Sequence, residues 1–193
     1  MNGWSSSRAA SSTSTPMGAD GLEKLLGSFR RSAFRLETRQ DYAVAGTEAE
    51  RLAAWRDHRP LPERSVRTNA YLRDVARAAL AGKEFTRLRI VAFPLSEYTL
   101  FELAGYAESA AAGERVLLAD RSASPDLDLH DDFWLFDDRI AVTLAYTTDG
   151  RFAGADLVRD REAVRRLTAI KYMTLGHGVP LNRFLAGLEK QSA

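Results

Sequence analysis

One junction constrains the fold more than any other feature of this sequence. Residues 87–93 end in an apolar run, which is typical of a strand in the middle of a sheet. Ser96 follows closely and can cap a helix that contains Leu100, Leu103 and Ala107. Open α/β sheets place their ligands at the carboxyl ends of such strands, so this junction is also a candidate binding region.

The other elements extend this pattern on both sides. We expect helix at residues 22–29, a strand at 32–38, a helix from Thr47 to about His58 opened by a capping box with Glu50, and a helix at about 66–81. Short strands then cluster at 115–118, 133–136, 140–146 and 151–157, before helices from about 160 and at 181–188. Early alternation followed by clustered strands predicts an α/β fold, with α+β as the alternative. Either way we expect a mixed β-sheet flanked by helices.

The first residues differ from the rest. Residues 1–18 hold eight Ser or Thr and little that is apolar, so we expect a flexible tail at 1–18 and a single α/β domain at 19–193. The sequence leaves open whether translation starts at Met1 or Met17. No apolar run approaches the roughly 18–20 residues that cross a bilayer, and there is no secretory signal, so we expect no membrane contact and a cytoplasmic location.

Charge is distributed unevenly. Residues 21–90 carry 15 Lys and Arg against 9 Asp and Glu, whereas residues 91–140 carry 3 against 11. A basic first half suits phosphate, so DNA binding through residues 21–90 is one hypothesis. Acidic residues interrupt this segment, however, and the interleaved aromatics of a nucleic-acid face are absent, so nucleic acid is not the expected partner. The two poles can instead neutralise each other within the fold or across a homo-oligomer.

Motifs of known chemistry are missing. The sequence has no GxxxxGK[ST], GxGxxG or GxSxG motif, and its lack of cysteine excludes thiol nucleophiles and Cys-ligated metal. His130 lies among acidic residues, but no second His stands at ligand spacing, and Asp131 and Asp137 occupy the positions where a calcium loop needs Gly and Glu. We therefore predict no metal site and no cofactor.

Two stretches remain as candidates for a binding pocket. The first helical turn after residue 96 holds Glu97 and Tyr98, with Glu102 further along, and residues 132–137 form an aromatic strand with an acid at each end. The alternatives are structural, namely acids that complement a helix N-terminus and aromatic residues that fill a core. The predicted pocket, whose acids would take a cationic or hydroxylated ligand, comprises Arg89, Glu97, Tyr98, Glu102, Asp132, Trp134 and Asp137.

Several stretches together resemble a known family. They are residues 25–26, 31–37, Tyr42, 50–55, 87–91, 94–98, 113–114 and 132–137, within a span of about 22–185. In order and spacing they resemble an uncharacterised actinobacterial domain family encoded beside Xre-type helix-turn-helix regulators in WhiJ-type loci. The resemblance implies a regulatory partner or sensor and not a known enzyme, with a helix-turn-helix regulator or a small ligand as the expected partner. The run Gly176-His177-Gly178 departs from the family's usual final helix and leaves a specialised role open.

The second half is also similar to phospholipase-D-like proteins. In those enzymes the His of an HxK motif attacks phosphorus and the Lys holds the phosphate, but no HxK occurs here. The resemblance therefore implies a non-catalytic version of that fold.

Three functional hypotheses result. The first is a non-enzymatic regulatory or sensory module that binds a protein partner or small ligand. The second is an enzyme of specialised metabolism that uses a Glu or Asp general base with Tyr98, since carboxylate base chemistry requires no recognisable motif. The third is DNA binding.

Overall fold

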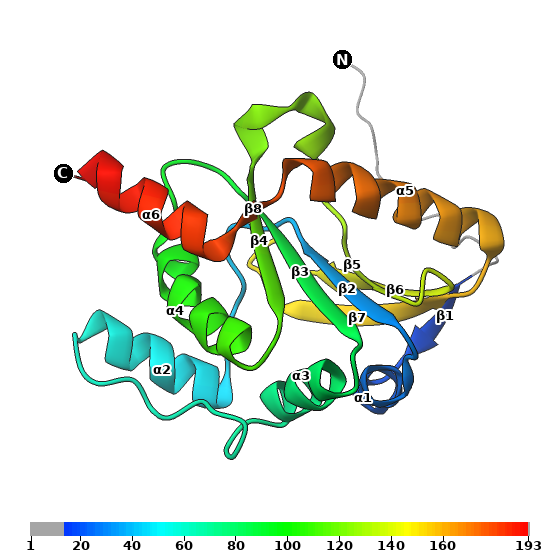
Figure 1. Ribbon diagram of the computed structural model, residues 1–193, viewed down its shortest axis with the longest axis horizontal. Helices are drawn as coiled ribbons and strands as arrows, with labels where there is room; N and C mark the ends of the chain where they lie inside the picture. Colours follow the sequence, from blue (N-terminus) through cyan, green and yellow to red (C-terminus); the bar gives the residue numbers. More distant parts are fainter. Residues whose placement is uncertain (1–13, 193) are drawn as a thin grey trace.

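A computed structural model, which describes residues 14–192, contains one sheet of eight strands in the order β1-β7-β6-β5-β2-β3-β4-β8 (Figure 1). The strands are β1 (Ser14–Met17), β2 (Ser32–Glu37), β3 (Glu84–Val91), β4 (Arg115–Asp120), β5 (Asp132–Phe136), β6 (Ile140–Tyr146), β7 (Phe152–Val158) and β8 (Val179–Pro180). The helices are α1 (Ala19–Ser28), α2 (Gly46–Arg56), α3 (Ala70–Leu80), α4 (Glu97–Ala111), α5 (Arg161–His177) and α6 (Leu181–Ser192). Two short 3-10 turns, Arg121–Ala123 and Pro125–Leu127, follow β4.

The sheet has a parallel and an antiparallel half. Strands β2, β3 and β4 are parallel, with α2 and α3 in the first crossover and α4 in the second. Strand β5 pairs antiparallel with β2, and β6, β7 and β1 continue outward in antiparallel pairs. The expected α/β fold, a mixed sheet flanked by helices, is confirmed.

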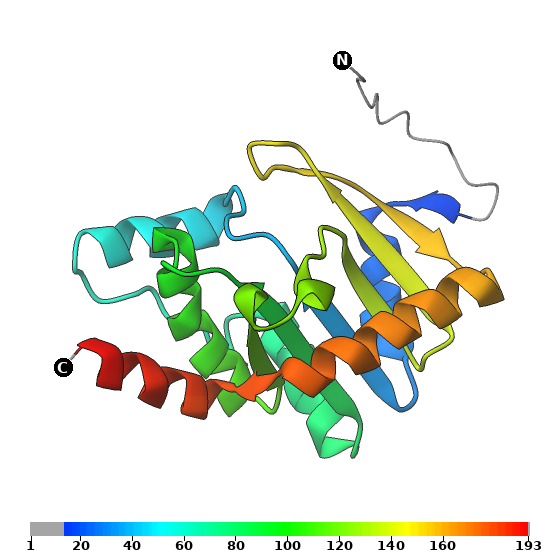
Figure 2. The same ribbon diagram turned by 90° about the horizontal axis from the view of Figure 1, so that it is seen from above.

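Helix α5 covers one face of the sheet, as Figure 2 shows. The alternate residues Phe34, Leu36, Leu88 and Ile90 of the central strands point to this face and are fully buried. Val164, with partly buried residues of α5, packs against them. The central part of this face is apolar, as expected for a sheet buried on that side.

The opposite face is divided into three regions. Helices α1 and α3 cover its apolar end, where Phe85, Trp134 and Phe136 form a cluster with Phe29. Helices α4 and α6 cover the side of β4. Between these regions, β2 and β3 present charged side chains instead of apolar ones, and this polar region positions the site described below.

Three predicted details differ in the structure. Residues 14–17, expected in the tail, form β1 against β7, while residues 1–13 lie outside the described part. The prediction of a capping box at Thr47 is wrong. Helix α2 begins one residue earlier, at Gly46, whose φ of +56° turns the chain into the helix. Helix α3 begins only at Ala70, since a turn at Ser65–Thr68 precedes it and Asn69 provides the cap.

The strand–helix junction that the sequence emphasised is confirmed. Ser96 caps α4 by accepting a hydrogen bond of 3.1 Å from the backbone N–H of Thr99. The hairpin of β5 and β6 turns at Asp137 and Asp138, both in the left-handed region. No helix between residues 14 and 192 is both long and apolar enough to cross a lipid bilayer.

Candidate functional site

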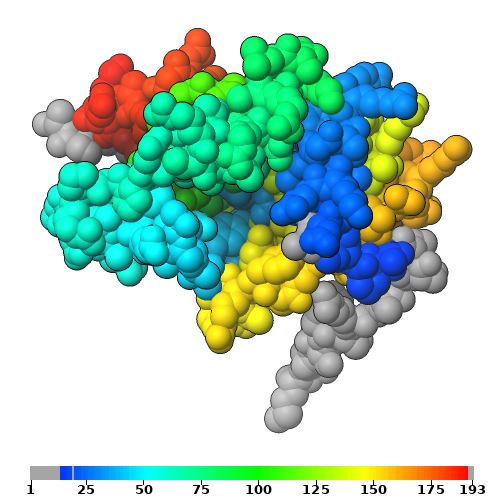
Figure 3. Space-filling model, turned by 90° about the horizontal axis from the view of Figure 1, so that it is seen from below, coloured from blue at the N-terminus to red at the C-terminus, as the bar shows by residue number. Residues whose placement is uncertain are grey.

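A cavity of about 450 Å³ lies over the polar region of the sheet. Its floor is β2 and β3, and its walls come from α2, α4 and the segment before α3. Figure 3 shows the corresponding hollow between α2, α3 and the β6–β7 hairpin. Most of its lining is charged or hydroxylated: Arg35, Arg51, Arg64, Arg87, Glu37, Glu48, Glu63, Glu102, Tyr42, Tyr71, Tyr98, Tyr106 and Tyr146.

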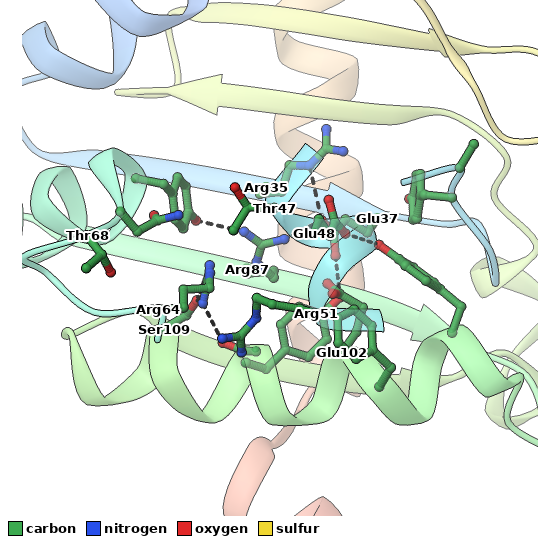
Figure 4. Close-up of a pocket in the computed structure, with 18 of the residues that line it drawn as sticks. Arg35, Glu37, Thr47, Glu48, Arg51, Arg64, Thr68, Arg87, Glu102 and Ser109 are labelled. Atoms are coloured by element: carbon green, nitrogen blue, oxygen red, sulfur yellow. Dashed lines mark hydrogen bonds and ion pairs between the residues drawn. The ribbon is translucent and has the colours of Figure 1, made fainter. Parts of the chain in front are cut away.

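The floor of the cavity is a fixed ion-pair network. Arg35 and Glu37 of β2 and Arg87 of β3 project from the same face, because side chains on a strand alternate between faces (Figure 4). Arg87 bonds to Glu37 and, at 3.0 Å, to Glu114. Burial alone would raise the pKa of Glu37, but Arg87, Arg35 and Arg89 outweigh it and hold the pKa at about 2. Glu37 is therefore ionised under all ordinary conditions.

Arg89, a predicted site residue, lies beside this network on the same face of the sheet but does not line the cavity. Its side chain is fully buried and donates to Tyr106 at 2.9 Å and to the backbone carbonyl of Gln40 at 2.8 Å. Tyr106 in turn donates to Glu37 at 2.7 Å. Arg89 thus supports the floor from its side and connects it to the loop after β2.

The structure places Asp132 and Trp134 inside the fold. Asp132 accepts bonds from Arg35 at 3.1 Å, from both the N–H and the hydroxyl of Thr38 at 2.8 Å, and from the hydroxyl of Tyr42. Its acceptor capacity is therefore used within the protein. Trp134 stacks on Phe136 in the apolar cluster, so this aromatic strand serves mainly as core.

Asp137 and Glu97 lie away from the cavity. Asp137 sits in the β5–β6 turn and accepts bonds from the backbone N–H groups of Arg30, Arg31 and Ser32 at 2.7–3.0 Å. Glu97 is exposed and pairs with Arg56 at 2.5 Å. Of the seven predicted residues, the structure brings Tyr98 and Glu102 to the cavity itself.

The wall formed by α4 also anchors the segment before α3. Glu108 on α4 pairs with Arg51 of α2 at 2.6 Å and with Arg64 at 3.2 Å. Arg64 further donates to the carbonyl of Gly105 at 3.0 Å, and Arg51 bonds to the carbonyl of Pro62. These contacts hold the covering segment over the sheet.

Two carboxylates face the cavity without a cationic partner. Glu48 accepts a 2.9 Å bond from the hydroxyl of Tyr98, and Glu102 forms no hydrogen bond or ion pair with any residue of the described chain. Burial raises the pKa of Glu102 to about 7, and repulsion from Glu48 and then Glu37 adds to the shift. Glu102 therefore exchanges a proton near neutral pH.

Metal binding has no evident place in this arrangement. Within residues 14–192, no group of three or more His, Asp or Glu side chains is positioned to hold a metal ion. His130 is exposed and its nearest carboxylate is Asp128, at 3.4 Å.

Residues 20–186 match the family described as "Domain of unknown function (DUF6879)". The chain belongs to this family. The expectation of an uncharacterised domain family is thereby confirmed, and its predicted span of about 22–185 agrees closely with the matched residues. No curated protein matches the chain.

Solved structures similar to this DUF6879 domain include a phospholipase D family member, NucT and an archaeal chromatin protein. Nuc, a phospholipase D family member from Salmonella typhimurium, is 9% identical with a TM-score of 0.46, over 83% of this chain and 90% of Nuc. NucT from Helicobacter pylori is 12% identical with a TM-score of 0.47, over 83% and 91%. TrmBL2, an archaeal chromatin protein, is 6% identical with a TM-score of 0.48, over 89% of this chain and 55% of TrmBL2.

Most cavity residues of the DUF6879 domain escaped the sequence analysis. A usable signal was present in the two central strands, where Arg35 and Glu37, and likewise Arg87 and Arg89, stand two residues apart between buried apolar residues. Charges at this spacing on a buried strand must gather on one face and be paired there. No comparable pattern marks Glu48, Arg51 or Arg64, which the crossover between β2 and β3 brings to the site.

Proposed function

We propose that this domain is a non-enzymatic sensory or regulatory module that binds a small polar molecule in the cavity over β2 and β3. The observation that carries the proposal is a polar cavity whose volume lies in the range of small-molecule sites, roughly 300–1,000 Å³. Glu48 and Glu102 face it with no cationic partner among the described residues.

The construction of the cavity supports binding rather than simple packing. The floor is already paired and buried, so a ligand would meet a preorganised surface and little reordering would oppose binding. The segment before α3, which covers the cavity, is attached to α4 mainly through Glu108. A ligand that shifts this segment can therefore shift α2 and α3 as well. The sequence resemblance suggests a helix-turn-helix regulator as the partner that reads this change.

A cavity-filling substitution tests the proposal. Gly105 lines the cavity, and a Cβ there would meet only Glu102 Oε1, at 3.8 Å, so Gly105→Leu places a side chain in the free volume without a backbone clash. Metabolites below about 1 kDa from the producing cells should raise the Tm of the wild type, because a ligand of the folded state stabilises it.

The matched control is Gly176→Leu, which adds the same side chain in open space on α5. We expect Gly176→Leu to respond like the wild type and Gly105→Leu not to respond. Equal responses of all three proteins would contradict binding in this cavity.

One observation favours an enzyme as the second candidate. A carboxyl with a pKa of about 7, beside the Tyr98 hydroxyl and Glu48, suits general acid–base chemistry at neutral pH. The two candidates differ in the fate of the bound molecule. Recovery of a bound metabolite unchanged after prolonged incubation supports the sensor, whereas conversion that Glu102→Gln abolishes supports the enzyme.

A further inference from the structure

We infer that the cavity selects a small hydroxylated amine, whose ammonium group lies between Glu48 and Glu102. This inference rests on the proposed binding function and adds the chemical class of the ligand. It depends on the charge left over when the internal pairs of the site are complete.

The guanidinium groups around the cavity already have acidic partners. Arg35 pairs with Asp132, Arg87 with Glu37 and Glu114, and Arg51 and Arg64 share Glu108. Arg89 lies 3.5 Å from Glu37. Five arginines thus face four paired carboxylates.

Adding Glu48 and Glu102 gives six carboxylates against the five arginines. The surplus negative charge is located on the cavity lining, because these two residues line it without an ion-pair partner in the described chain. Figure 4 shows both side chains among those that border the cavity. An anionic ligand would meet repulsion at this position, and a cation would meet attraction.

An organic cation fits this charge better than a metal ion does. Glu48 and Glu102 alone do not provide the six or more oxygens that calcium prefers, their neighbour Glu37 is already paired with Arg87, and no metal-binding group is found within residues 14–192. An ammonium group needs only two or three acceptors, which two carboxylates and a tyrosine hydroxyl supply.

The rest of the lining favours hydroxyl groups on the same molecule. Thr47 and Tyr146 bring hydroxyls to the cavity, and Arg35, 5% exposed, has an Nη1 nitrogen that lacks a hydrogen-bond partner. Such groups recognise hydroxyl or ether oxygens, whereas an apolar ligand would leave them without partners. The complementary molecule therefore carries one cationic end and several oxygens.

Three probes of nearly equal size separate the charge classes. Glucamine is an open-chain hydroxylated amine, sorbitol is its neutral counterpart and gluconate its anionic counterpart. Calorimetric titration at about pH 8 keeps Glu102 ionised. We expect glucamine to bind with a Kd of about 1 mM or lower, as a ligand of this size reaches at ordinary efficiency, and sorbitol at least about tenfold more weakly.

Two variants tie the selectivity to these carboxylates. Glu102→Gln and Glu48→Gln should each weaken glucamine binding about tenfold and leave sorbitol binding unchanged. Glu50→Gln, which removes an exposed charge from the same helix as Glu48, should bind glucamine like the wild type.

Stronger binding of sorbitol or gluconate, no measurable glucamine binding up to about 10 mM, or equal affinity in the Glu102→Gln protein would overturn the inference. The proposed function is tested separately, by the response to cell metabolites. If these metabolites stabilise the wild type but not Gly105→Leu while glucamine does not bind, the proposed binding function stands and the cavity binds a ligand of another class.

Discussion

Individual residues around the cavity have different roles, and Glu102 differs from most of the other acids in having no ion-pair partner in the described chain. The acids in the floor have arginine partners, whereas Glu102 forms no ion pair within the described chain, and burial with repulsion from Glu48 and Glu37 outweighs the attraction of Arg89 and Arg87. Its folded-state pKa of about 7 lies above its ordinary value of 4.5. The folded protein therefore binds this proton more tightly than the unfolded chain does.

The consequence for stability has a definite sign. Between about pH 5 and pH 7 the folded state holds more protons than the unfolded state, so Glu102 makes the wild type lose stability as pH rises. Glu102→Gln does not titrate. The unfolding free energy of Glu102→Gln should therefore exceed that of the wild type by an amount that grows across this interval to roughly 1–3 kcal/mol and stays constant above about pH 8. Urea unfolding of both proteins from pH 5 to pH 8 measures it, and a difference independent of pH would contradict this assignment.

Asp132 should behave oppositely, as a structural residue. Replacing it with Asn breaks the closer of the two ion pairs of the buried Arg35 and leaves only Glu37, at 3.6 Å, and breaking a buried pair costs about 3–5 kcal/mol of unfolding free energy. Asp131→Asn, at the exposed neighbouring position, should change stability by less than about 0.5 kcal/mol. Denaturant unfolding at neutral pH compares the two, and a loss below about 1 kcal/mol for Asp132→Asn would show that the network does not depend on it.

At the level of elements, α4 anchors the segment that covers the cavity through Glu108 and also places Glu102 in the cavity lining. Gly105 lies in the middle of this helix, where glycine costs about 0.5–1 kcal/mol relative to Ala. Gly113, just beyond its end, has a φ of +109° and would bring a Cβ to 2.6 Å from that of Ala79.

Substitution of these two glycines by Ala should therefore have opposite effects on stability. Gly105→Ala should stabilise the protein by about 0.5–1 kcal/mol, since the added Cβ fits the cavity, and Gly113→Ala should destabilise it by at least about 1 kcal/mol. Thermal unfolding of the two variants is the measurement. A loss of stability in Gly105→Ala would indicate that the cavity is filled by protein atoms in solution.

The elements also show where sequence reasoning succeeds. Strands β2, β3, β5 and β6 and the Ser96 cap follow from local alternation and turn residues, which the sequence displays directly. Helix α2 began a residue early because Gly46 adopts a left-handed conformation that no periodicity reveals. Residues Glu48, Arg51 and Arg64 reach the cavity through the long crossover between β2 and β3, so their role depends on tertiary contacts.

At the scale of the whole molecule, the uneven charge acquires an internal explanation. The basic excess of residues 21–90 includes the buried Arg35, Arg51 and Arg89 and the largely covered Arg87. Apart from Glu37, their acidic partners Glu108, Glu114 and Asp132 come from residues 91–140. The two charged halves of the sequence therefore meet beneath and around the cavity. Much of the charge that suggested a DNA-binding face is used within the fold.

The central claim is that the cavity over β2 and β3 holds a small molecule. A crystal structure of the protein purified from the cells that naturally produce it tests this most directly. We predict density for a bound compound beside Glu48 and Glu102, absent from Gly105→Leu prepared in the same way. A cavity in the wild type that is closed by the protein's own side chains would contradict the claim.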